Sequence, residues 1–248
     1  MYRTFWLLTL SLLFPSTIFA EKPEVMRFVY TRPPEHAVSQ WLILVYTEAF
    51  RRMDIRFEFI SVPPKRASLY SSLGKADGEL GRVYVYNEKY PMMVRVEERH
   101  ALIVFAAFSH NKALKLDGWD SLEGTTYKVC YRRGIKKAET QLNRVLTNGK
   151  LYQAKTVAQG IKMLESGSRI DFYIDIENAV TGELESETRP VPIYMAGVME
   201  KTTGHAFLHE RHAELAPELS QHLREMKQAG LFDEYLRQVN LSRRDISW

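Results

Sequence analysis

The stretch MRFVYTRPPEHAVSQWLILVYTEAFRRMDIRFEFISV, from Met26 to Val62, places two strand-like runs on either side of a helical pattern. Residues 26–31 are mostly apolar, and residues 55–62 alternate apolar and polar side chains as a strand does. Between them, apolar side chains recur at helical spacing, at Val38, Trp41, Leu42, Val45 and Ala49. A strand, a helix and a strand in this order predict a β-α-β unit, and hence a fold of the α/β class.

Strands and helices keep alternating along the rest of the chain. Strand patterns follow directly after Gly74 and at residues 101–108, 127–131, 171–176 and 191–199. Helical patterns occupy residues 63–73, 135–146, 157–164 and 216–239, and Thr156 with Gln159 forms a capping box before the third of these. We therefore expect mixed sheets flanked by helices, divided over two lobes.

The first 20 residues have the pattern of a secretory signal peptide. Arg3 precedes an apolar run from Phe5 to Phe14, and a small-residue exit follows at Ala20. This run is much shorter than the roughly 20 residues that a membrane-spanning helix needs. The single cysteine, Cys130, lies far from the predicted cleavage point, so it neither anchors a lipid nor forms an internal disulfide. We expect an exported protein that works in the periplasm.

The charge balance gives little support for nucleic-acid binding. The chain has 34 Lys and Arg residues against 30 Asp and Glu residues, a formal charge of +4 at pH 7. The basic residues are scattered, and no long basic block with interleaved aromatic residues occurs. With 45% hydrophobic and 26% charged residues, the composition is typical of a globular protein with a substantial core.

Several motifs, in their order and spacing, resemble the periplasmic solute-binding proteins of bacterial family 3, which are known mainly for polar amino acids. They are PPKRA at 63–67, GKADGELGR at 74–82, SGSRIDFYIDIENAV at 166–180 and QAGLFDEYL at 228–236. The resemblance implies a type II periplasmic-binding fold, in which two α/β lobes joined by two crossing segments close over a ligand in the cleft. It maps lobe one to residues 21–108 with 198–248, lobe two to residues 109–197, and the crossings to Phe105–His110 and Ile193–Val198.

The resemblance places the acid and the cation of GKADGELGR in the cleft, after a strand of lobe one. Ligands of open α/β sheets bind beyond the carboxyl ends of the strands, so Glu79 and Arg82 are expected to contact the two ends of a zwitterion. The alternative interpretation is a salt bridge of small net value between them. In the amino-acid binders a Thr shortly precedes the Arg that holds the ligand carboxylate. This chain has no such Thr, so that carboxylate clamp does not transfer.

Further candidate contacts come from strand ends and from one helix start. Tyr131, Arg132 and Arg133 precede the predicted helix at 135–146, where the resemblance places the anionic end of the ligand and where a helix dipole favours anions. Asp175 matches the acid of lobe two that holds the ligand ammonium in the family, and its alternative role is to cap the following helix. Tyr30, at the end of the first strand, is the expected aromatic wall.

Metal binding and catalysis have weaker support in the sequence. His205, His209 and His212 lie close together, and a helix would bring the first two onto one face. Neither an HExxH order nor a Cys partner accompanies them, so we expect surface histidines and no metal or cofactor. No G-x-S-x-G motif occurs, and we expect no enzyme activity. A dehydratase-like enzyme of the same fold, with Glu79 or Glu177 as its acid, is the alternative.

The resemblance implies a monomeric protein that captures a small polar solute, an amino acid or a related compound, and delivers it to an ABC permease. The alternative is a periplasmic sensor that signals to a membrane partner. The fold alone does not separate these two roles, because the same fold serves both.

Overall fold

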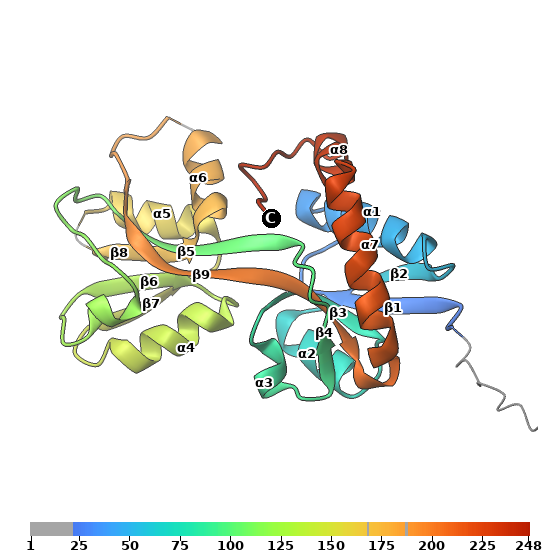
Figure 1. The fold of residues 1–248 in the computed structure, drawn as a ribbon. Helices are drawn as coiled ribbons and strands as arrows, with labels where there is room; N and C mark the ends of the chain where they lie inside the picture. Colours follow the sequence, from blue (N-terminus) through green and yellow to red (C-terminus); the bar gives the residue numbers. More distant parts are fainter. Residues whose placement is uncertain (1–21, 168, 187) are drawn as a thin grey trace, which may run out of the picture.

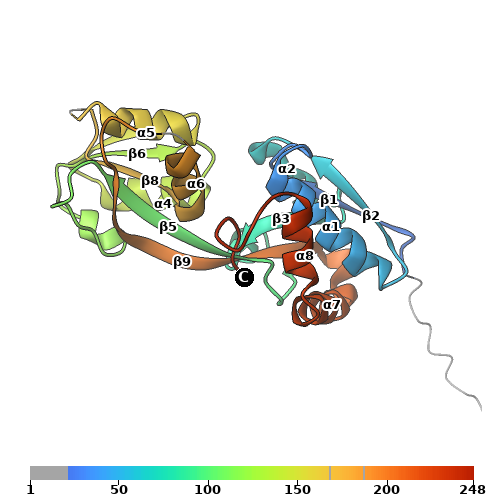
Figure 2. The same ribbon diagram turned by 90° about the horizontal axis from the view of Figure 1, so that it is seen from above.

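The computed structural model describes residues 22–167, 169–186 and 188–248, so the predicted signal peptide at residues 1–20 lies outside the described residues. Two α/β lobes lie at the two ends of a pair of long strands (Figure 1; Figure 2). The predicted two-lobed α/β architecture with a mixed sheet is confirmed. Within the described ranges, no helix is both long enough and apolar enough to cross a membrane.

The first lobe is built on the β-α-β unit predicted from residues 26–62. β1 (Val25–Tyr30) pairs in parallel with β2 (Arg56–Ser61) on one side and with β3 (Gly78–Val83) on the other. α1 (Ala37–Arg51) packs its apolar face in one core with residues of the C-terminal helices α7 (Ala216–Gln228) and α8 (Leu231–Gln238). The smaller elements of this lobe are α2 (Pro64–Ser72), α3 (Tyr86–Lys89), β4 (Met93–Arg95) and the 3-10 helix η2 (Glu210–Leu215).

The second lobe holds the other end of the same sheet, with two core clusters of its own on the faces of that part. β6 (Lys128–Arg132) pairs in parallel with β7 (Lys150–Ala154) and with β8 (Phe172–Ile176). The helices of this lobe are η1 (Trp119–Leu122), α4 (Lys136–Val145), α5 (Val157–Glu165) and α6 (Glu177–Ser186). The predicted cap of α5 is confirmed, because Thr156 Oγ1 accepts a hydrogen bond from the Gln159 backbone N–H at 3.1 Å.

Two antiparallel strands, β5 (Ala101–Ser109) and β9 (Tyr194–His209), run through both lobes and join the strands into the order β2-β1-β3-β9-β5-β8-β6-β7. Residues 105–108 of β5 pair with β8, so this part of β5 belongs to the second lobe. The crossings therefore lie nearer to residues 101–104 and 201–204 than to the predicted Phe105–His110 and Ile193–Val198. The lobe limits at 108, 109, 197 and 198 stay a prediction.

β9 is longer than the sequence indicated. The predicted strand ended at Met199, whereas β9 continues through His205 to His209. His205 and His209 therefore belong to a strand, and the helical face expected to bring them together does not form.

The C-terminal segment after α8 contacts both lobes and the crossing strand β5. Ile246 is buried in the first lobe, and Trp248 stacks on Trp41 with ring centroids 6.1 Å apart. The Leu102 N–H of β5 donates to the Ser247 carbonyl at 2.6 Å. The Asn178 side-chain amide of α6, in the second lobe, donates to the Asp245 carbonyl. This segment thus connects the first lobe, a crossing strand and the second lobe.

Candidate functional site

The strand predicted shortly after Gly74 is confirmed as β3, GELGRV, so Glu79 and Arg82 lie within a strand, and the expectation that they follow one is corrected. In parallel register with β1, Glu79 lies beside Val29, one residue from the end of that strand. The pairing of β3 with β9 is irregular between Glu79 and Arg82. At this irregularity Gly81 has a φ of +68°, and a Cβ there would lie 2.5 Å from the Tyr30 ring. Glycine is needed at position 81 because it tolerates the left-handed conformation and leaves room for Tyr30.

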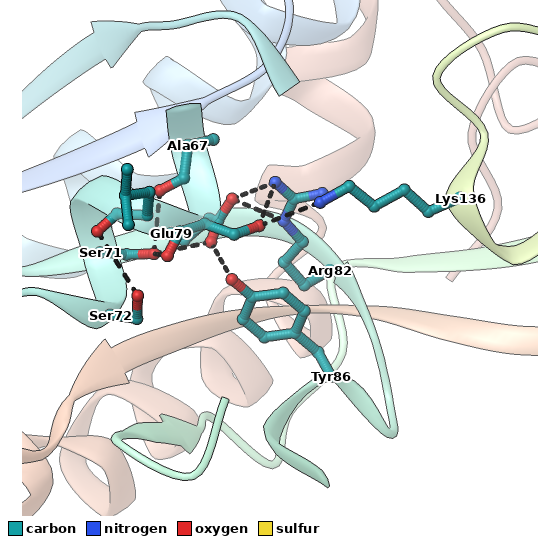
Figure 3. Close-up of polar contacts among 9 residues, drawn as sticks. Ala67, Ser71, Ser72, Glu79, Arg82, Tyr86 and Lys136 are labelled. Carbon is teal, nitrogen blue, oxygen red and sulfur yellow. Dashed lines mark hydrogen bonds and ion pairs between the residues drawn. The ribbon is translucent and has the colours of Figure 1, made fainter. Parts of the chain in front are cut away.

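Glu79 has a completely buried side chain whose carboxylate is satisfied by its neighbours (Figure 3). Its Oε2 accepts hydrogen bonds from the Ser71 hydroxyl at 2.8 Å and the Tyr86 hydroxyl at 2.5 Å. Its Oε1 accepts from Arg82 Nε at 2.6 Å and also from Arg82 Nη2. Burial and the adjacent Glu79 carboxylate raise the pKa of Tyr86, so its hydroxyl stays protonated and donates. A buried carboxylate is stable only with such partners.

Arg82 connects the first lobe to the second through one hydroxyl group. Its side chain is 14% exposed, lies over the Tyr86 ring at 5.3 Å, and donates from Nη2 to Ser68 Oγ at 3.3 Å. Lys136, the first residue of α4 in the second lobe, places its Nζ 3.5 Å from the same Ser68 Oγ. Figure 3 shows Lys136 extending toward the Arg82 guanidinium. Cations from both lobes therefore meet at Ser68.

Arg132 and Asp175 form a second buried pair, at the ends of the adjacent strands β6 and β8. Arg132 donates from Nε and Nη2 to the two oxygens of Asp175, at 2.8 Å and 2.9 Å. Asp175 also accepts from the Tyr173 hydroxyl at 2.5 Å and from the Ile176 backbone N–H at 2.7 Å. Asp175 is fully buried, whereas the Arg132 side chain is 20% exposed. At these strand ends the guanidinium of Arg132 is thus partly exposed, whereas the carboxylate of Asp175 is buried.

Electrostatic effects on Arg132 and on His36 indicate that Arg132 lies close to the first lobe. Burial lowers the pKa of Arg132, but Asp175, Tyr173 and, from the first lobe, Tyr30 together raise it, and the net effect is a raised pKa. Burial, Arg32 and Arg132 lower the pKa of His36, which accepts a hydrogen bond at the start of α1. The end of β1 and the start of α1 therefore lie within the field of the Arg132 guanidinium.

The structure brings together some of the sequence-predicted residues and separates others. Tyr30, Glu79, Arg82, Arg132 and Asp175 lie at the facing ends of the two lobes. Tyr131 is 1% exposed and packs in a core of the second lobe, so we leave it out of the proposed site. Arg133 is exposed on the turn before α4, and its role as a ligand contact stays a prediction.

Asp77, the other acid of the stretch GKADGELGR, lies apart from this group. It precedes β3 and accepts hydrogen bonds from the Arg27 backbone N–H at 2.8 Å, from Arg211 Nη2 at 2.5 Å and from His212. These contacts connect the start of β3 to η2. Asp77 therefore stabilises the first lobe.

The sequence analysis missed Ser68 and Lys136. Lys136 occupies the first position of a helix, where the dipole disfavours a cation, and that mismatch is a signal that sequence reasoning could have used. Ser68 lies within an ordinary helical pattern and has no comparable signal.

Other reactive side chains give no sign of a second chemical centre. In the part of the chain that the structure describes, no group of three or more His, Cys, Asp and Glu residues is placed to hold a metal ion. His205 contacts the Val96 carbonyl and Thr203 within the first lobe. Burial raises the pKa of the Cys130 thiol to about 12, which leaves it protonated and unreactive at neutral pH.

Comparison with known proteins shows similarity in both sequence and fold. No family model matches the chain. An uncharacterized protein of Shewanella oneidensis is 34% identical over 225 residues, which cover 90% of this chain and 85% of that protein. A substrate-binding protein of an amino acid ABC transporter from Streptococcus pneumoniae, bound to L-arginine, is 15% identical with a TM-score of 0.64, over 91% of this chain and 97% of that one. A histidine kinase sensor domain with similarity to periplasmic binding proteins is 15% identical with a TM-score of 0.63, over 88% and 95%.

Proposed function

This chain belongs to the same family as the Shewanella oneidensis protein and has the type II periplasmic-binding fold, and from this premise we propose that it is a periplasmic solute-binding protein. In this proposal a small polar solute binds between the lobes, and the lobes close over it. The proposed site contains Tyr30, Arg82, Arg132 and Lys136 as ligand contacts, with Glu79 and Asp175 behind the arginines.

One observation carries the proposal. Arg82 from β3 and Lys136 from α4 approach the same hydroxyl, that of Ser68, from opposite lobes. Glu79 neutralises only one of these two cations, Arg82, so a polar solute group that accepts from both cations is stabilised between the lobes. A bound solute that contacts both would favour the closed arrangement by its higher affinity for that state.

The proposal is tested by binding to the purified protein. Native mass spectrometry of protein purified without denaturation should detect a retained solute, and a thermal-shift panel of amino acids, small peptides and organic acids should identify its class. A solute at about 100 times its dissociation constant adds about 2.7 kcal/mol to the free energy of unfolding. If no retained solute is detected and the whole panel leaves the melting temperature unchanged, solute binding by this protein is refuted.

Delivery to an ABC permease is the first proposed role, because the fold neighbours include substrate-binding proteins of amino acid ABC transporters. Sensing is the second, because a histidine kinase sensor domain has the same fold. The discriminating observation is genetic. Adjacent permease and ATPase genes favour delivery, whereas an isolated gene or one beside a kinase favours sensing.

The fold neighbours include binding proteins and a sensor domain, so we propose binding without catalysis. The dehydratase alternative named Glu79 or Glu177 as its acid. Glu79 is buried and saturated with hydrogen bonds, which argues against a role in proton transfer to a solute.

A further inference from the structure

The hydrogen bonds around the two buried carboxylates bear on the charge of the solute. A carboxylate has about four lone-pair positions, two on each oxygen. Asp175 Oδ2 accepts from Arg132 Nε and Tyr173, and Oδ1 accepts from Arg132 Nη2 and Ile176. All four positions of Asp175 are therefore in use.

Glu79 has the same arrangement in the first lobe. Its Oε1 accepts twice from Arg82, and its Oε2 accepts from Ser71 and Tyr86. Both carboxylates also have no exposed side-chain surface. The strongest partner for a solute ammonium is a carboxylate with a free lone pair at a reachable surface, and neither Glu79 nor Asp175 offers one.

The groups that remain reachable near these carboxylates are cationic. Arg82 and Arg132 are partly exposed, and each is matched by one buried acid. Lys136 is also partly exposed, and in the described ranges no carboxylate lies within ion-pair distance of it. The group of Glu79, Arg82, Arg132, Lys136 and Asp175 thus has three positive and two negative charges, with the negative charges concealed.

From this arrangement we propose that the solute is a small organic anion, bearing carboxylate or phosphate groups, and that it is neither an α-amino acid nor a cation. This inference rests on the proposed function of solute binding and names the solute class. One anionic group lies against Arg82 and Lys136, which each supply charge-assisted donors and whose mutual repulsion it relieves. Arg132 supplies the donor from the second lobe, and Asp175 fixes the orientation of its guanidinium.

The test compares probes that differ by one charged group. Thermal shift and calorimetry are run with glutarate, succinate, 3-phosphoglycerate, L-glutamate, L-glutamine and L-arginine, beside native mass spectrometry of the retained solute. The proposal expects the retained solute to be an anion without an ammonium group. It expects glutarate to bind at least about tenfold more tightly than L-glutamate, since the ammonium of the latter loses its water without gaining an acceptor. Carboxylate and phosphate probes distinguish the two sources of negative charge.

If the retained solute, or the solute that binds most tightly, is an α-amino acid such as L-arginine, this inference is overturned while the proposed function is supported. A complete lack of binding by any solute would overturn the proposed function itself, and this inference with it.

Variants of this chain give a second, independent readout. Lys136→Ala should weaken binding of the tightest anionic probe by about ten- to a hundredfold, and Lys136→Arg should restore most of it. The matched control is Lys162→Ala, which removes an exposed lysine from α5 of the same lobe and should leave affinity within about twofold.

Asp175→Asn separates the two interpretations of that residue when a probe with an ammonium is compared with one without. If Asp175 only orients Arg132, the variant changes the affinities for glutarate and for L-glutamate by similar factors. If Asp175 binds a solute ammonium, the affinity for L-glutamate falls at least about tenfold more than that for glutarate. Such a selective loss, with the circular dichroism spectrum of the wild type retained, contradicts the proposal. If the variant does not fold, the Lys136 series decides the question alone.

Discussion

At the scale of single residues, two roles were expected as alternatives for Arg82: a ligand contact, or a salt bridge to Glu79 of small net value. The structure shows a salt bridge to a carboxylate with no exposure, which is a different case from an exposed pair. Breaking a buried pair by removing one partner leaves an uncompensated charge in the interior.

Arg82→Ala is therefore expected to lower the free energy of unfolding by about 3–5 kcal/mol, because Glu79 loses both hydrogen bonds from its cation. Urea unfolding followed by circular dichroism measures this. The double variant Glu79→Gln, Arg82→Ala should recover a large part of the loss, since it removes the buried charge as well. Arg51→Ala is the matched control, because Arg51 pairs with Glu48 at the same spacing on an exposed helix face. Equal losses in the two single variants would contradict the burial argument.

His100 makes the stability of the first lobe depend on pH. It is buried, its Nδ1 lies 2.7 Å from the Tyr46 hydroxyl, and burial, with His205 and Lys227 nearby, lowers its pKa to about 3. In the unfolded chain the pKa returns to about 6.5, so protons bind only the unfolded state between these values. Stability is thus unaffected by His100 above pH 6.5 and falls as the pH decreases toward 3.

The expected loss from His100 between pH 7 and pH 5 is about 2 kcal/mol, since each pH unit below the unfolded pKa contributes about 1.4 kcal/mol. Urea unfolding at both pH values measures it, in a range above the titration of most unfolded carboxyl groups. His100→Gln keeps a hydrogen-bonding group near Tyr46 and should remove most of this pH dependence. A His100→Gln protein that loses as much stability as the wild type would show that other groups are responsible.

At the scale of elements, the sequence predicted those with strong periodicity and missed those without it. α1 and α4 were predicted because apolar side chains recur on one face, β2 because apolar and polar residues alternate, and β1, β6 and β8 because they are largely buried apolar runs. The second half of β9 was missed because its crossing residues, EKTTG at 200–204, are polar and partly solvated, so no strand alternation occurs there. β7 was missed because KLYQA is a short edge strand with one fully buried residue.

The candidate site was predictable as a set of charged residues at strand ends, but its pairings were not. Arg132 and Asp175 are 43 residues apart, and only the parallel register of β6 with β8 brings them together. Both residues were predicted to contact the ligand, because the sequence alone does not show that Arg132 and Asp175 form hydrogen bonds with each other. Lys136 and Ser68 meet across the lobes, and that contact depends on how the two lobes are oriented at the ends of one continuous sheet.

The C-terminal segment should contribute measurably to stability although it is short. Trp248→Ala removes the stacking on Trp41 and the contact with Phe232, whose ring centroid lies 5.3 Å away. Because Trp248 is half-buried, we expect a loss of about 2 kcal/mol, below the range for a fully buried Trp. Chemical unfolding of the variant measures it, and Leu73→Ala, at a side chain that is 60% exposed, is the control with little expected change. A Trp248→Ala loss no larger than the control would show that this segment is not held in place.

At the scale of the whole molecule, the two lobes are joined by β5 and β9 and by the C-terminal segment, and closure over a solute must bend these connections. Small-angle X-ray scattering should show a smaller radius of gyration at saturation with the tightest solute found in the binding screen. Lys136→Ala, assayed at its own saturating concentration, should compact less, because it lacks the cation that meets the solute from the second lobe. An unchanged radius of gyration for the saturated wild type would rule out closure.

The late position of β9 and of the last helices in the sequence also determines the order in which the protein can be assembled during synthesis. The core of the first lobe joins Phe28, Trp41 and Phe50 to Leu208, Leu219 and Phe232, which emerge more than 150 residues later. The second lobe draws mainly on residues 103–184, a continuous stretch that includes β6, α4, β7, α5 and β8, and its late core residues come from β9 and Ile193. A chain that is synthesised from its N-terminus can therefore organise its middle first, whereas the face of α1 that packs against α7 and α8 stays uncovered until those helices are made. During that interval this face is a natural target for holding chaperones.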